Sequence, residues 1–117
     1  MDNIKLYEQV DGIWRERTSL DFSLLVIGRD PISKVVCFSP SKNDIINLQA
    51  KVDTLGNGIN FKESPESISL NWQKIGPERI KAGDRSSAMT IEVSANSGPV
   101  RAETFRIMIE ALEVPSE

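Results

Sequence analysis

Apolar and polar residues alternate along two runs near the C-terminus of the chain. In the first run, residues 89–94, the apolar positions are Met89, Ile91 and Val93. In the second run, residues 104–112, they are Phe105, Ile107, Ile109 and Ala111. A period of two is typical of strands with one buried face. An Asn-Ser-Gly-Pro cluster separates the runs, so the pattern predicts an antiparallel hairpin.

The C-terminal run also fits a helix. Its apolar positions at helical spacing are Val100, Phe105, Met108, Ile109 and Leu112, and Pro99 suits a first helical turn. The strand buries Ile107 and exposes Met108, whereas the helix does the reverse. A helix over residues 99–113 therefore stays open as the alternative.

Residues 42–55 carry the same ambiguity. A helix would begin at a capping-box pattern over residues 41–44 and would bury Ile45, Leu48, Val52 and Leu55. A strand would bury the alternating positions Ile46, Leu48, Ala50 and Val52. Because the alternation has no exception over eight residues, we favour the strand, with a helix near residues 42–55 as the alternative.

The N-terminal part predicts a hairpin and several short strands. Asp11-Gly12 lies between apolar-rich runs at residues 4–10 and 13–18, and Asp-Gly suits a type I′ turn. Further strands are expected at residues 22–27, 35–38, 59–62 and 68–73. In the last of these, alternation predicts that Trp72 lies in the core on the same face as Ile68 and Leu70.

Short strands separated by turn signals predict an all-β sandwich or barrel. The segment Ile68-Ser69-Leu70-Asn71-Trp72 resembles a central strand with a core Trp, and residues 80–84 followed by 89–93 resemble an Ala-Gly-Asp turn and its strand. On these residues, and on a closing strand at 104–111, residues 46–114 resemble a bacterial immunoglobulin-like β-sandwich. The fold expected is all-β, an immunoglobulin-like antiparallel β-sandwich with an N-terminal hairpin. The alternative is an α+β fold with helices near 42–55 and 99–113.

Composition bounds the class of protein. The chain of 117 residues is 39% hydrophobic and 26% charged, which fits one globular domain over residues 1–117, with residues 115–117 expected to fray at the end. The net charge of −3 includes no basic stripe for phosphates, so we expect no nucleic-acid partner. No apolar run approaches the length of a membrane span, and the single Cys37 lies in an apolar run. We therefore expect a cytoplasmic protein with no membrane partner.

The residue types also bear on catalysis. The chain has no histidine, which removes the commonest general base and the imidazole metal ligands, and one cysteine is too few for a zinc site. Ser39 and Lys42 have the spacing of a serine–lysine acylation site, but the accompanying motifs are missing. We expect no cofactor, no metal and no enzymatic activity.

The remaining candidate is a partner-binding site at the N-terminal hairpin. Trp14, Arg15 and Arg17 follow the Asp-Gly turn, and Trp and Arg are enriched at binding hot spots. The expected function is that of a non-catalytic protein–protein interaction module, such as an accessory, adaptor, viral structural or inhibitory protein. Its partner would be another protein, and association with copies of itself stays open. The alternative is a small-molecule-binding β-sandwich, which would require an apolar pocket with convergent polar groups.

Overall fold

The computed structural model describes residues 3–22, 24–53, 58–97, 99–101 and 106–115. All the regular secondary structure in these residues is β-strand, so the protein is all-β. The strands are β1 (Ile4–Val10), β2 (Ile13–Arg17), β3 (Leu24–Leu25), β4 (Ile32–Pro40), β5 (Asp44–Asp53), β6 (Ile59–Phe61), β7 (Gln73–Lys74), β8 (Arg79–Ile80), β9 (Met89–Ala95), β10 (Val100–Arg101) and β11 (Arg106–Val114). The described ranges include no helix that could cross a bilayer.

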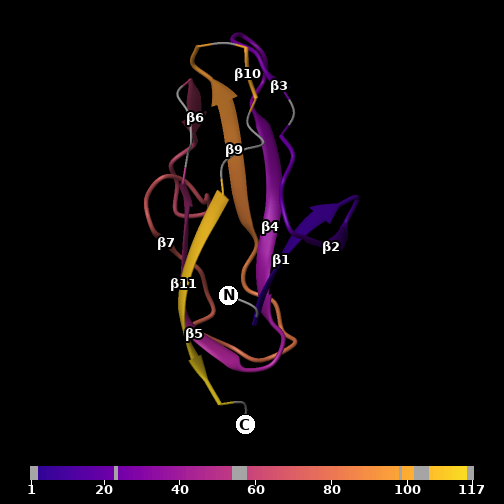
Figure 1. Ribbon diagram of the computed structural model, residues 1–117, viewed down its shortest axis with the longest axis vertical. Helices are drawn as coiled ribbons and strands as arrows, with labels where there is room; N and C mark the ends of the chain where they lie inside the picture. The colour runs from indigo at the N-terminus through magenta and orange to yellow at the C-terminus, as the bar shows by residue number, and fades with distance from the viewer. Residues whose placement is uncertain (1–2, 23, 54–57, 98, 102–105, 116–117) are drawn as a thin grey trace.

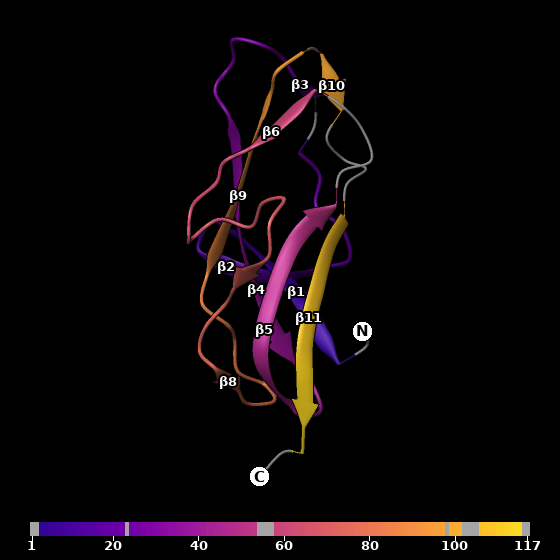
Figure 2. The same ribbon diagram turned by 90° about the vertical axis from the view of Figure 1, so that its left-hand side faces the viewer.

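The strands form two main antiparallel sheets that pack as a β-sandwich. The first sheet has the order β2-β1-β4-β9-β6, and the second has the order β11-β5-β7, with β8 also paired to β5. A separate ladder joins β3 to β10. Figure 1 shows β5, β7 and β11 on one side of the molecule and β1 and β4 on the other. In Figure 2 the second sheet faces the viewer, with β11 along its margin.

The N-terminal hairpin is confirmed. Asp11 and Gly12 have φ values of 52° and 79°, as a type I′ turn requires at both central positions. Val10 and Ile13 are the first pair beyond the turn. The hairpin joins the first sheet through β1, which pairs with β4, and Figure 1 shows its tip projecting sideways from the elongated body.

The C-terminal strands form as the alternation predicted, but the predicted hairpin between them is wrong. β9 pairs with β4 and β6 in the first sheet, whereas β11 pairs with β5 in the second. Alternation identifies a strand and its buried face but carries no information about its neighbour. Along β11, Ile107 and Ile109 pack on the core, and Met108 is 40% exposed. These positions contradict the helical alternative over 99–113; Phe105 lies outside the described residues.

Residues 44–53 are also a strand, which contradicts the helical alternative near 42–55. The predicted buried face needs one correction, because the inward residue at the start of β5 is Ile45 rather than Ile46. Glu110 of β11 pairs with Gln49 of β5, and Leu112 pairs with Ile46. An advance of two residues along β11 therefore corresponds to three residues along β5. The additional residue is a bulge at Asn47, whose φ is 57°. A bulge reverses the alternation, so it moves the buried position from one parity to the other.

The predicted core position of Trp72 is wrong. Trp72 is 39% exposed and Leu70 47% exposed, whereas Ile68 is fully buried. The segment is not a strand there, because it crosses from one sheet to the other. Ile68 N–H donates to Thr90 O in β9 at 2.8 Å, and Val52 N–H in β5 donates to Ser69 O at 2.7 Å. The crossing buries both flanking serines with Ile68 and directs Leu70 and Trp72 outward.

Aliphatic side chains from both sheets fill the space between them. Phe22, on the connection after β2, is the largest fully buried side chain and is 1% exposed. The other fully buried apolar residues include Val36, Ile45, Leu48, Val52, Ile68, Ile75, Ile80, Ile91 and Val93. At one side this packing is incomplete, because Leu6, Ile107 and Ile109 face inward and are only partly buried. The candidate site lies there.

Candidate functional site

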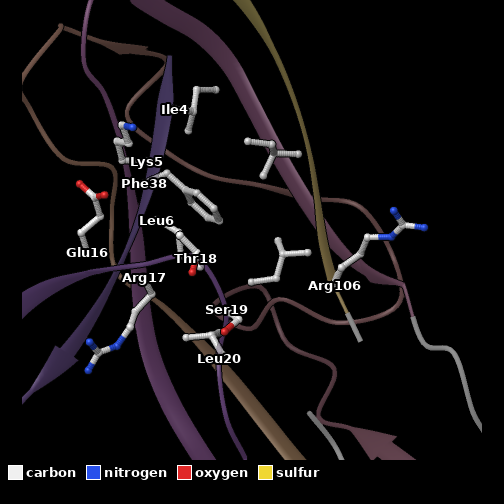
Figure 3. Close-up of a pocket in the computed structure, with 12 residues that line it drawn as sticks. Ile4, Lys5, Leu6, Glu16, Arg17, Thr18, Ser19, Leu20, Phe38 and Arg106 are labelled. Atoms are coloured by element: carbon white, nitrogen blue, oxygen red, sulfur yellow. The ribbon is translucent and has the colours of Figure 1, made fainter. Parts of the chain in front are cut away.

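A cavity of about 490 Å³ opens between the two sheets, where β1 faces β11. Its apolar lining comes from Ile4, Leu6, Leu20, Phe38, Ile107 and Ile109. Thr18 and Ser19 supply two hydroxyl groups from the connection after β2. Figure 3 shows Leu6, Leu20 and Phe38 grouped around this space, with Arg17 and Arg106 directed away from it toward opposite rims. The cavity therefore has an apolar floor and charged margins.

β11 forms one wall of this cavity and is also an edge strand. Among the described strands, only β5 pairs with it, along its full length of nine residues. An edge strand leaves about half of its backbone N–H and C=O groups directed away from the sheet. The inward residues from Ile107 to Ala111 are apolar and partly buried. No charge points inward there to prevent another strand from adding to this edge.

β2, the edge strand of the first sheet on this side of the molecule, does carry charged residues on its inward side. Arg15 and Arg17 pair with Glu8 and Leu6, residues on the inner face of β1, so both arginines lie on the inward side of the edge. Inward-directed charges are a common protection of sheet edges against further pairing. Of the two strands, β11 is therefore the one that is open to strand addition.

A charged cluster supports the hairpin wall of the cavity. Glu8, only 8% exposed, accepts hydrogen bonds from Arg17 Nε at 3.0 Å and from Lys34 Nζ at 2.9 Å. Burial by itself raises the pKa of Glu8, but the hydrogen bonds and charges of Lys34 and Arg17 outweigh it and lower the pKa below its ordinary value. Lys34 Nζ also lies 5.4 Å from the centre of the Phe22 ring. This cluster fixes Arg17 at the rim.

The rim on the β11 side is less constrained. Arg106 Nε is 3.7 Å from Asp53 Oδ2, and the Arg106 side chain is 73% exposed. Lys5 and Glu16 complete the charged margin, so three cations and one anion surround the opening. The carboxylates of Glu8 and Asp53 lie against two of these cations, Arg17 and Arg106, so the opening presents charges of both signs to a partner.

The three predicted partner-binding residues do not form one cluster. Arg17 lines the cavity, and Arg15 is exposed on the same face of β2. Trp14 lies on the other face, partly buried, and the Arg85 guanidinium is 5.7 Å from its ring centre. Trp14 is thus half covered by the chain's own arginine. The sequence interpretation missed the residues on the facing wall, Ile107 and Ile109, although their alternation had marked them as inward.

The Cys37 thiol and the Ser39 hydroxyl are enclosed. Burial raises the pKa of Cys37 to about 11, although Arg85 acts in the opposite direction, and the side chain is inaccessible. Ser39 Oγ, also buried, donates to the backbone oxygen of Asp84 at 2.6 Å. Over the part of the chain that the structure describes, no group of acidic, Cys or His side chains could hold a metal ion.

Comparison with known proteins gave no family. No protein-family model, no curated protein and no solved structure matched the chain. The resemblance to immunoglobulin-like domains therefore stays a prediction.

Proposed function

We propose that this protein is a non-catalytic protein–protein interaction module that binds an extended segment of its partner by strand addition at β11. Added strands gain affinity from main-chain hydrogen bonds and specificity from pockets that take alternate side chains. β11 offers both features, since its edge is unpaired in the described structure and the cavity lies directly on its inner side. The single observation that carries the proposal is this juxtaposition.

The partner segment would contact both walls of the opening. One apolar side chain would enter the cavity between Leu6 and Ile109, which are now partly exposed to solvent. Arg106, whose side chain is 73% exposed at the rim, would meet an acidic group of the partner. Arg15, on the same face of β2 as Arg17, would extend the contact along the hairpin.

A second candidate is a small-molecule-binding β-sandwich. The observation in its favour is the cavity, whose volume of about 490 Å³ lies in the range of roughly 300–1,000 Å³ that is usual for ligand pockets. Its lining of apolar groups with two hydroxyls would take an apolar ligand with a polar end. The long, open edge beside it has no role in this alternative, which is why we place protein binding first.

Selection from a display library of ten-residue peptides tests the proposal. We expect peptides with apolar residues at alternate positions, and their binding should be lost in the variant Ile109→Lys, which places a charge on the inner side of β11. The matched control is Ile13→Lys, because Ile13 is an exposed isoleucine on the other edge strand; this variant should bind normally. The unfolding midpoint of each variant, measured first, shows that binding is compared between folded proteins.

N-methylation of a selected peptide then separates strand addition from simple pocket binding. Methyl groups on the amides that face β11 remove the donors of the ladder, and methyl groups on the other alternate amides do not. Strand addition predicts loss of binding for the first peptide only. Equal binding of both peptides, or no peptide that depends on Ile109, would refute the proposed mode.

A further inference from the structure

We propose that the segment added to β11 is β11 of a second copy of this chain, antiparallel and centred on Met108. This inference rests on the proposed function and names its partner. When two identical antiparallel strands are related by a twofold axis, the numbers of any two residues that lie opposite each other add up to the same value. With Met108 opposite Met108 of the second copy, Ile107 lies opposite Ile109, and Arg106 lies opposite Glu110. Each of the last two pairs occurs twice.

This register is complementary on both faces of the strand. On the inner face, the partly buried Ile107 and Ile109 would each gain an isoleucine from the second copy. On the outer face, Met108, which is 40% exposed, would contact its own equivalent. Arg106, whose Nε is 3.7 Å from Asp53 Oδ2, would lie between that carboxylate and Glu110 of the second copy. Opposite charges and apolar pairs across strands are the stabilising combinations in a sheet.

The neighbouring registers are less favourable. Centring the pair on Glu110 places two carboxylates directly opposite each other, which is destabilising. Centring it on Ile109 pairs Arg106 with Leu112 and Met108 with Glu110, so both charges face apolar groups. Side chains of the inner face must lie opposite inner-face side chains of the second copy. An odd-numbered residue therefore always pairs with an odd-numbered one, and an even-numbered residue with an even-numbered one. Centring the pair on Ile107 places Arg106 opposite Met108. Of these four registers, only the one centred on Met108 therefore brings opposite charges together.

A charge exchange between two variants tests this register. Arg106→Glu and Glu110→Arg each place like charges opposite each other in the homodimer, so each should raise the dimer dissociation constant by about tenfold or more. In an equimolar mixture of the two variants, every 106–110 pair again has opposite charges. Sedimentation velocity over about 1–300 μM protein should therefore show weak association of each variant alone and restored association in the mixture. The matched control is Glu92→Arg, on β9 of the first sheet, which should associate like the wild type.

Cysteine cross-linking gives an independent measure of the register. Met108→Cys would place two thiols opposite each other across the twofold axis, whereas Leu112→Cys would not. Leu112 is 59% exposed and Met108 is 40% exposed, so cross-linking by random collision would favour position 112. The register predicts faster disulfide formation at position 108 in diamide, and the native Cys37 is buried and does not compete.

The outcomes separate this inference from the proposed function. A monomer at all concentrations, or a mixture that associates no better than its components, overturns the self-pairing. If peptides dependent on Ile109 are still selected, the proposed strand addition holds with a different partner. If association persists but Ile109→Lys does not affect it, the dimer uses another surface and the inference is wrong.

Discussion

Glu8 and Lys34 lie on the inner face of neighbouring strands, with 2.9 Å between Glu8 Oε2 and Lys34 Nζ. Both side chains are largely removed from solvent, and Arg17 binds the other carboxylate oxygen. A carboxylate held between two cations has a role in stability as well as in the geometry of the rim. Its removal leaves two charges without their partner at the side of the core.

We expect Glu8→Ala to lower the free energy of unfolding by about 2–4 kcal/mol at neutral pH, because breaking a buried ion pair leaves an uncompensated charge. Urea unfolding followed by tryptophan fluorescence measures this loss. Glu16→Ala is the control on the adjacent strand, since Glu16 is exposed, and it should change the free energy by less than about 0.5 kcal/mol. Equal effects of the two substitutions would contradict the role of the cluster.

The same cluster predicts acid sensitivity. The pKa of Glu8 in the folded protein is lowered below its ordinary value of 4.5. Its contribution to stability is therefore present above that value and is lost as the pH falls through the folded-state pKa. The difference in unfolding free energy between wild type and Glu8→Gln should shrink as the pH falls below about 4.5. A difference that is constant from neutral to acid pH would show that ionisation of Glu8 is not the cause.

Asn47 predicts an unusual order of substitutions. Its φ of 57° lies in the left-handed region, which asparagine tolerates and glycine adopts freely. Asn47→Gly should keep or slightly raise the unfolding midpoint, whereas Asn47→Val should lower the free energy of unfolding by about 1–2 kcal/mol. Thermal unfolding of the two variants measures the contrast. A higher midpoint for the valine variant would mean that β5 has no bulge at this residue.

Trp72 and Phe22 should respond differently to truncation. Phe22→Ala removes the largest fully buried side chain and should cost about 3–5 kcal/mol. Trp72 is 39% exposed, and Lys51 Nζ lies 5.1 Å from the centre of its ring. Trp72→Ala should therefore cost only about 1 kcal/mol, as measured by urea unfolding. A loss as large as that of Phe22→Ala would return Trp72 to the core.

Cys37 should be inert in the folded protein. Burial raises the pKa of its thiol to about 11, so almost no thiolate forms at pH 8, and reagents cannot reach the side chain. Mass spectrometry should show no alkylation by iodoacetamide under native conditions and one alkylation after unfolding in guanidinium. The variant Met108→Cys, with an exposed second cysteine, should gain one label in the native state. Rapid native labelling of the wild type would contradict the enclosed position of Cys37.

The sequence predicted those parts of the fold that local chemistry determines. Asp11-Gly12 requires positive φ at both turn positions, so the first hairpin and its boundaries could be inferred from two residues. The alternation along β5 and β11 likewise favoured strand over helix, although it left the helical alternatives open. These features depend on neighbours in the chain alone, which is why they could be recognised without a structure.

Features that depend on distant contacts could not be inferred. Ile45 is the inward residue instead of Ile46 because of the bulge at Asn47. Nothing in the local alternation of apolar and polar residues indicates that bulge. Trp72 alternates as a strand residue would, but its segment bonds to both sheets and not to one. The candidate site had the same limit: Arg17 was identified from its type, while the cavity exists only because β11 lies across from β1.

The pairing of β11 with β5 also has a consequence for synthesis of the chain. Nearly half of the sequence lies between the two strands, so β5 leaves the ribosome long before its neighbour exists. Closing so long a loop is slow compared with forming the first hairpin. During this interval the apolar inner side of β5 is incompletely covered, and nascent chains are then most exposed to aggregation. β11 is the last strand of the second sheet to be synthesised, and no other described strand pairs with its outer edge. The emergence of β11 is therefore the step that decides whether the second sheet is completed or its open face associates with another chain.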